Sequence, residues 1–179
     1  ARMASILNVD KIRAAGSTND AVTVDSTGRV LTPARPVFEV HTSATTTGTA
    51  GTYVKVNWGN VVTDVGSNFD LTDNDYTIPI TGAYHLNCLL LLRDSANADD
   101  DIHAAFYVNG SLSKYLPLRN TGESATGNCG YSGYLPVFGA WTHVFNANDV
   151  VDVRFRGSGD GINVHGSGAW SQFSGFLIG

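Results

Sequence analysis

Residues Tyr76–Leu92 read YTIPITGAYHLNCLLLL: a short alternating segment, a turn at Thr81-Gly82, and a second segment that alternates and then becomes wholly apolar. Pro79 ends the first segment because proline fixes φ and lacks a backbone donor. A sandwich strand normally buries one face and exposes the other, so the apolar run Cys88–Leu92 predicts a strand covered on both faces. Contact with a second subunit is the simplest way to cover the second face of this strand.

The composition is typical of one β domain with a short appendage. The chain has 179 residues, of which 20 are glycines and 15% are charged, and helical periodicity is nearly absent. A net charge of −5 without a Lys/Arg cluster argues against a nucleic-acid surface. No apolar run approaches the ~20 residues of a membrane span, so membrane insertion is not expected.

The two cysteines and the N-terminus add little. Cys88 and Cys129 belong to no metal-binding or redox spacing, and both are interpreted as reduced, with Cys88 as a small core residue. No signal peptide is recognisable at the N-terminus. Ala1 and Arg2 precede Met3, which is a candidate for the natural start.

A boundary is expected near residue 35, dividing the chain into segments 1–35 and 36–179. The first segment has too few apolar residues to fold alone, although two strand-like pieces around Asp25–Gly28 predict a small hairpin. Pro33 and Pro36 bracket the boundary.

From Val37 onward, short strand-like segments recur at ~8–12-residue spacing, which is typical of an antiparallel sandwich or jelly roll. Asn109-Gly110 predicts a tight turn, and Gly139 separates two expected strands. Alternation over Val150–Arg156 places Val151, Val153 and Phe155 inward. The expected strands besides those of Tyr76–Leu92 are 38–41, 53–58, 61–65, 102–108, 131–138, 141–145, 150–156, 162–165 and 170–178.

Four motifs, in order along the chain, resemble the globular head domain of complement component 1q, within the tumour necrosis factor-like superfamily. They are Phe69-Asp70 with Tyr76, Pro79, Gly82 and Tyr84; Phe106–Gly110; Asn146–Val153, with Asn148 where glycine is usual; and Ser171–Ile178. The resemblance covers Pro36–Gly179. It implies an all-β, ten-stranded antiparallel jelly-roll sandwich that assembles as a homotrimer, whose subunit contact would cover Leu89 and Leu91.

The N-terminal segment points to a different setting from that of the animal complement proteins. It lacks the collagen-like Gly-X-Y stem that usually precedes their heads. Ser5–Ile12 and Val24–Val30 instead resemble the N-terminal anchors of tailed-bacteriophage fibre and head-fibre proteins. Those anchors are short and trimeric and attach a C-terminal knob to the virion, so residues 3–35 are expected to contact virion proteins.

The histidines give no sign of catalysis. The five are scattered over expected strands, and none has the spacing of a zinc protease or a neighbouring nucleophile elbow. They are interpreted as surface or interface residues. His85 and His103 are candidates to face a trimer axis, where protonation would introduce like charges.

An acidic loop is the candidate metal site. Oxygen ligands of this kind suit calcium, but their order does not match an EF-hand loop, so a solvated acidic loop is the alternative. The loop contains Asp94, Asn97, Asp99, Asp100 and Asp101.

Aromatic residues between Ser111 and Trp141 are candidates for ligand recognition. Rings beside amide and hydroxyl groups suit stacking on a sugar or anchoring a protein, whereas core packing is the alternative. The candidates are Tyr115, Tyr131, Tyr134 and Trp141.

Together these patterns predict a non-enzymatic, trimeric virion protein: a fibre knob whose loops engage a glycan or protein of a bacterial surface. A head-decoration protein of the capsid is the second interpretation, and a lectin-like binding module unconnected with a virion is the third. An enzyme is the least supported.

Overall fold

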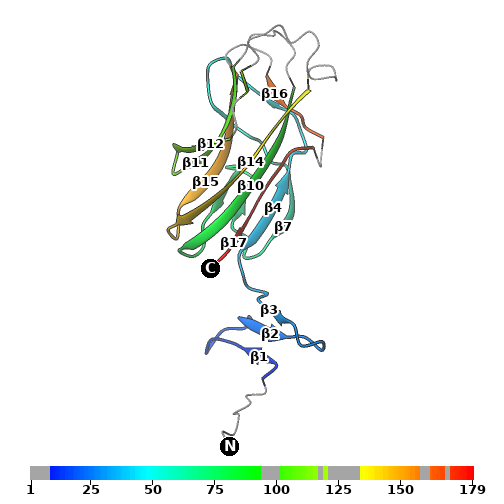
Figure 1. The fold of residues 1–179 in the computed structure, drawn as a ribbon, viewed down its shortest axis with the longest axis vertical. Coiled ribbons are helices and arrows are strands. Elements are labelled where there is room, and N and C mark those ends of the chain that lie inside the picture. The colour runs from blue at the N-terminus through cyan, green and yellow to red at the C-terminus, as the bar shows by residue number, and fades with distance from the viewer. Residues whose placement is uncertain (1–8, 94–100, 117–118, 121–133, 158–161, 168–169) are drawn as a thin grey trace, which may run out of the picture. The chain divides into compact units, whose positions relative to one another are not determined.

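The computed structural model describes residues 9–93, 101–116, 119–120, 134–157, 162–167 and 170–179. The chain forms two compact units, Ala1–Pro36 and Val37–Gly179 (Figure 1). Over the described ranges the structure is built from strands, and none of its helical segments has the length and apolar character needed to cross a membrane.

The first unit is a three-stranded antiparallel sheet of β1 (Lys11–Ile12), β2 (Val22–Val24) and β3 (Val30–Leu31). The predicted hairpin is confirmed by the pairing of β2 with β3. Asp25 holds its turn, because Oδ1 accepts hydrogen bonds from the backbone N–H groups of Thr27 at 2.9 Å and Arg29 at 3.0 Å. Gly28 supplies the positive φ of 84° that the turn requires.

Apolar side chains of the first unit are exposed. Ile12, Val30 and Leu31 are 53%, 68% and 46% exposed. Ion pairs of Asp20 with Lys11 at 2.8 Å and Arg13 at 2.6 Å join parts of the sheet. A sheet this small is marginal by itself. The expectation that this segment cannot bury enough to fold alone stays a prediction.

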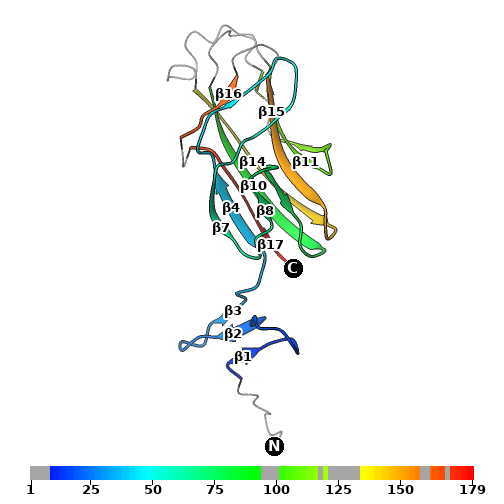
Figure 2. The ribbon, with the colours of Figure 1, turned by 180° about the vertical axis from the view of Figure 1, so that it is seen from behind.

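The second unit is an antiparallel jelly-roll sandwich of two sheets (Figures 1 and 2). The β10 sheet has the order β7-β4-β17-β10-β14; β16 pairs with Leu92–Arg93 at the end of β10, and β5 pairs with β16. Its strands are β4 (Val37–His41), β5 (Thr46–Thr47), β7 (Asn60–Asp64), β10 (Gly82–Arg93), β14 (Tyr134–Phe145), β16 (Asn163–Val164) and β17 (Gln172–Leu177).

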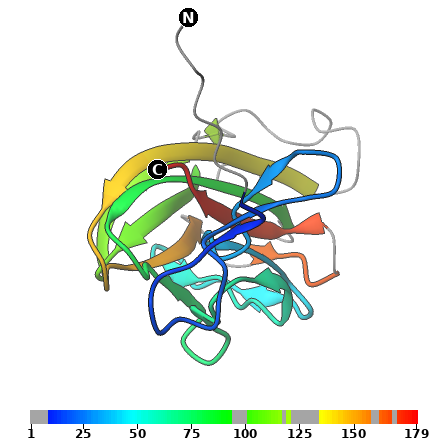
Figure 3. The same cartoon turned by 90° about the horizontal axis from the view of Figure 1, so that it is seen from below.

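The β15 sheet has the order β12-β11-β15-β9-β8, with β6 paired to β15 and β13 to β11. Figure 3 shows the strands of both sheets from one end of the sandwich. The strands of the β15 sheet are β6 (Val54–Lys55), β8 (Phe69–Asp70), β9 (Asp75–Thr77), β11 (Asp101–Val108), β12 (Ser111–Tyr115), β13 (Arg119–Asn120) and β15 (Val150–Gly157).

The core lies between the two sheets and is rich in aromatic rings. Phe38 stacks on Tyr76 with ring centroids 3.9 Å apart, and Phe173 meets Phe38 edge-on at 4.8 Å. On β15, Val151, Val153 and Phe155 are fully buried, which confirms the prediction from alternation. Alternate residues of β10 enter the same core with no exposed surface: Tyr84, Leu86, Cys88, Leu90 and Leu92.

Two turns have the backbone that their residues predict. Asn109 and Gly110 have φ of 51° and 76° and connect β11 to β12, which confirms the tight turn. Asn148, where the complement-head motif that the sequence resembles usually has glycine, has φ of 71°. The position therefore requires the left-handed region, which asparagine tolerates better than most residues other than glycine.

Two strand predictions are wrong. Gly139 does not separate two strands, because β14 runs without interruption and pairs with β10 along all twelve residues of each strand. The strand expected over residues 53–58 is reduced to Val54–Lys55, the part that pairs with Phe155 and Arg154 of β15. In both cases pairing with a distant strand decides the outcome.

Gly175 of β17 fits where a larger residue would not. A Cβ there would lie 2.6 Å from Leu86 Cδ2 and 2.7 Å from Phe38 Cε1. We predict that Gly175→Ala lowers the free energy of unfolding by about 1–3 kcal/mol through overpacking. Denaturant unfolding measures the change. Gly179→Ala, which would meet nothing within 4 Å, is the control; equal stability of the two variants would contradict the packing argument.

Candidate interaction surfaces

The face of the β10 sheet that points away from the core carries an unusual number of apolar side chains. On β10, Leu89 and Leu91 alternate with the buried residues and remain partly exposed. Phe138 and Pro136 of β14 lie opposite them, and both are exposed. A single chain therefore covers one face of the apolar run and leaves the other open.

The surface continues along β14 and onto β17. Phe138 and Val144 of β14 are each 64% exposed, and Phe176 of β17 is 45% exposed. Phe176 lies beside His85, with ring centroids 5.5 Å apart. We call this surface the apolar face; it consists of Leu89, Leu91, Pro136, Phe138, Ala140, Val144 and Phe176.

His85 borders the apolar face, whereas His103 does not. His85 Nδ1 lies 3.0 Å from Thr142 Oγ1 on β14. His103 is on β11 in the β15 sheet, opposite Arg156. The expectation that His103 shares a surface with His85 is wrong, because the two strands belong to different layers of the sandwich and each histidine points away from the core between them.

The outer face of the β15 sheet is polar and holds a network of charges. Asp152, whose side chain is 2% exposed, accepts hydrogen bonds from Arg154 Nε at 2.7 Å and Nη2 at 2.9 Å. Lys55 Nζ lies 3.0 Å from Asp75 Oδ2 and 3.6 Å from Asp152 Oδ2. The hydrogen bonds to Asp152 raise the pKa of Arg154. The guanidinium also lies over the ring of Tyr107, with Cζ 4.1 Å from the centroid.

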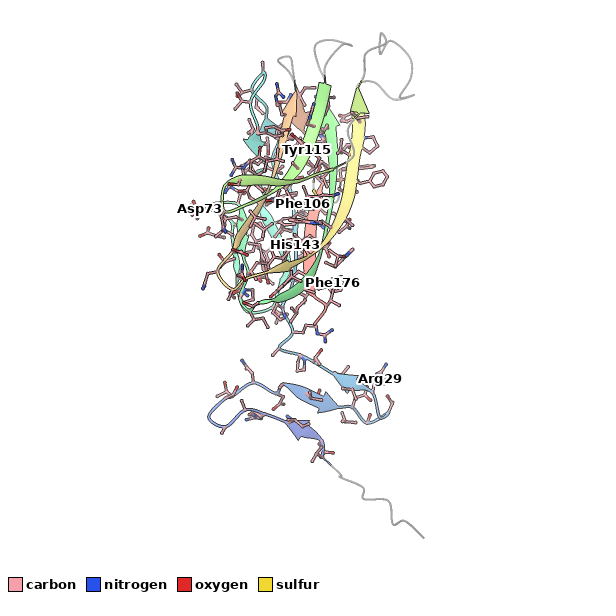
Figure 4. All side chains as sticks on the ribbon, turned by 60° about the vertical axis from the view of Figure 1, so that its left-hand side comes forward. Arg29, Asp73, Phe106, Tyr115, His143 and Phe176 are labelled. Carbon is pink, nitrogen blue, oxygen red and sulfur yellow. The ribbon has the colours of Figure 1, made fainter. Side chains whose placement is uncertain are left out.

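The predicted aromatic candidates do not form one site. Tyr115 is 48% exposed on β12, on the outer side of the β15 sheet (Figure 4). Tyr134 is on β14 in the other sheet, next to His165. Trp141 packs against Phe106 at the core, 6.0 Å between centroids, so the core interpretation holds for this residue. Tyr131 lies outside the described residues.

The candidate calcium loop falls mostly outside the structure's described ranges. Asp94, Asp99 and Asp100 lie outside the described residues. Of Asp101, at the start of β11, only the backbone is described. Within the described ranges, no group of three or more His, Cys, Asp or Glu side chains could hold a metal ion. Calcium binding stays a prediction.

Cys88 is a free, fully buried thiol, as its core interpretation requires, and burial raises its pKa.

Sequence reasoning missed most of the apolar face and the charge network. Alternation carried through Gly139 would have placed Pro136, Phe138 and Val144 on one face. Likewise, the inward residues of β15 imply that Asp152, Arg154 and Arg156 point outward. The partners of these residues come from distant strands, so the sequence offers no comparable signal for them.

The comparisons with known proteins concern the fold. No family model and no curated protein matches the sequence. Among solved structures, the globular domain of zebrafish complement 1qA is similar, with a TM-score of 0.56 and 14% identity over 81% of this chain and 98% of that one. Murine APRIL has a TM-score of 0.55 and 13% identity, covering 80% and 99%. Eiger TNF from S. frugiperda has a TM-score of 0.57 and 16% identity, covering 81% and 94%.

The second unit thus has the jelly-roll fold of the complement 1q head and of TNF, as the sequence motifs predicted. At these identities the likeness shows the fold alone. Function has to be argued from the surfaces of this chain.

The charge network gives a testable contribution to stability. We predict that Asp152→Ala lowers the free energy of unfolding by about 1.5–3 kcal/mol, because two cations lose a buried acceptor. Asp73→Ala is the control: Asp73 is exposed and receives Lys55 Nζ through its backbone carbonyl, so the contact survives. Thermal and urea unfolding measure the stability of both variants. An unchanged free energy of unfolding in Asp152→Ala would contradict a stabilising role of the network.

Proposed function

We propose that this chain is a non-enzymatic structural protein of a bacteriophage virion, a trimeric fibre knob that displays loops for attachment to a bacterial host surface. The apolar face carries the proposal. It requires a cover that one chain lacks, and the resemblance to complement heads implies that two further subunits supply it.

The trimer is supported by the amount and position of apolar surface. Isolated exposed apolar residues are ordinary, but several on one face of a sheet mark a candidate interaction site. Here they lie on both sides of the polar residues His85, Asn87 and Thr142. Phe138, Val144 and Phe176 lie on three strands of one sheet together with Leu89 and Leu91. A three-fold axis beside this face would bring three copies of it together. Each buried large side chain then contributes roughly 1.5–3 kcal/mol before entropy costs are subtracted.

The virion setting is supported by the first unit. Its sequence resembles phage fibre anchors, and its small sheet leaves Ile12, Val30 and Leu31 exposed. Such a sheet gains stability by packing against other chains, which is how an anchor works. The two compact units match a division of labour between anchoring and display.

The first test of the proposal is the solution mass. We expect a mass of three chains for the natural protein and of one chain, or aggregates, for Leu89→Asp, Leu91→Asp and Phe138→Asp. Phe138→Asp is the sharpest of the three, because its side chain is already 64% exposed in a single chain and the core does not need it. Light scattering after size exclusion measures the mass, and far-UV circular dichroism checks the fold.

Leu71→Asp is the matched control. Leu71 is an exposed leucine in the turn between β8 and β9, away from the apolar face. It should keep the mass of three chains. A natural protein of one-chain mass would refute the trimer, and folded trimers from all three face variants would refute the apolar face as the contact between subunits.

The second test separates anchoring from display. We predict that deletion of residues 3–35 abolishes incorporation into particles, measured by mass spectrometry of purified virions, and leaves the second unit folded and trimeric. Excess free second unit should also slow adsorption of intact particles to host cells. Incorporation of the deleted chain into particles would contradict the anchoring role of the first unit. Normal adsorption in the presence of excess free second unit would favour head decoration over host attachment.

A further inference from the structure

The outer face of the β15 sheet contains a compact group of aromatic and cationic side chains that neither the trimer nor the anchor uses. We call it the tyrosine–arginine face; it consists of Tyr53, His103, Tyr107, Tyr115, Arg154 and Arg156. Its residues come from β11, β12, β15 and the residue before β6. Ala105 lies between Tyr115 and Arg154 in the register and is fully buried in spite of its outward position, because the larger side chains cover it.

The aromatic rings of this face hold one another in place. Tyr53 packs against Tyr107 with centroids 5.6 Å apart, and His103 lies 6.1 Å from Tyr115. Tyr53 Oη is 3.5 Å from His103 Nδ1. Burial, together with a hydrogen bond to Tyr115, raises the pKa of Tyr53 to about 12, so its hydroxyl stays protonated at neutral pH. The face therefore presents preorganised rings and neutral hydroxyl groups.

The two arginines of the face differ in charge balance. Arg154 is neutralised by Asp152, as described above. Arg156 lies near Tyr53, with Cζ 5.9 Å from the ring centroid, and no ion pair or hydrogen bond joins it to another described residue. Its Nε is buried without a hydrogen-bond partner. A guanidinium left without an anion beside a low-dielectric ring surface favours a bound carboxylate, which matches its planar fork.

The chemistry of the face narrows the class of ligand. Nucleic acid needs a row of cations along its phosphates, and among the described residues of this face Arg156 is the single uncompensated cation. A lipid surface needs many exposed apolar side chains, whereas this face offers mainly hydroxyl, imidazole and guanidinium groups, with the exposed Leu112 opposite Tyr107. Flat rings with hydroxyl groups at their edges suit a sugar, whose C–H faces stack and whose hydroxyl groups exchange hydrogen bonds.

We propose that the tyrosine–arginine face binds a carboxylate-bearing saccharide, with Arg156 pairing with the carboxylate and the rings of Tyr53 and Tyr115 contacting the sugar. This site is separate from the loops to which the proposed function assigns attachment. It needs no virion, so its failure would leave the trimer and the anchor untouched.

The test is calorimetric titration of the full chain with trimers of galacturonate and of mannuronate. The methyl-esterified galacturonate trimer, which keeps the rings and loses the charge, is the ligand control. We expect at least one acidic trimer to bind at least about tenfold more tightly than the ester. Arg156→Gln and Arg156→Lys should each weaken that binding about tenfold or more, since neither keeps the fork. Tyr115→Ala should weaken it about three- to tenfold.

Lys114→Gln is the matched protein control. Lys114 is the neighbour of Tyr115 on β12 and pairs with the inward-facing Phe106. The substitution therefore removes one positive charge from the side of the strand opposite to Tyr115. It should bind as the natural chain does. An unchanged melting temperature and solution mass show that each variant is folded, and Tyr115→Ala, at an exposed position, serves if the Arg156 variants do not fold.

Several results would overturn the inference. Among them are binding to neither acidic trimer, equal binding of the ester, and full affinity in the folded Arg156 variants. A loss of affinity in Lys114→Gln equal to that in Arg156→Gln would indicate general charge attraction instead of a site. Acetyl-triglycine, which carries a free carboxylate and no sugar, completes the set; binding as tight as that of the saccharides would assign the face to peptides.

Discussion

The second unit depends on strand β10, whose alternate side chains have to fill the core on one face and form part of the outer surface on the other. It pairs with β14 along all twelve of its residues and with β17 over Tyr84–Leu89. One set of alternate side chains fills the core with no exposed surface. From the other set, Leu89 and Leu91 join Phe138 and Phe176 in the apolar face, next to the polar His85 and Asn87. Because the period of a strand is two, a shift of register by one residue would exchange these sets.

The two outer faces of the sandwich have opposite characters. On the β10 sheet, apolar side chains are left open and their burial requires other chains. On the β15 sheet, Asp152 neutralises Arg154, and the remaining polar groups stay accessible at the surface. In an assembly about the apolar face, the tyrosine–arginine face belongs to the opposite layer of the sandwich. The proposed subunit contact and the proposed saccharide site thus lie on different layers of the sandwich, so that changes in one need not disturb the other.

Local patterns predicted much of this fold, and pairing between distant strands accounts for what they missed. Alternation in β15 located Val151 and Val153, and Asn109-Gly110 located a turn, since both depend on neighbouring residues alone. Glycine at position 139 predicts a break between strands when only its neighbours are considered. The strand continues through it because Gly139 pairs with Cys88, which is far away in the sequence. A sequence does not say which layer of a sandwich a strand joins, so it gives no sign that His85 and His103 belong to different sheets. The Arg156–Tyr53 contact spans the chain and had no local signal.

Hydroxyl-radical footprinting of the intact protein tests the covering of the apolar face most directly. Phe138 and Phe173 have the same chemistry; a single chain leaves the first 64% exposed and the second fully buried. If other subunits cover the face, Phe138 should react at a small fraction of its rate in the unfolded chain, close to the fraction for Phe173. A Phe138 rate near that of the unfolded chain would contradict the account.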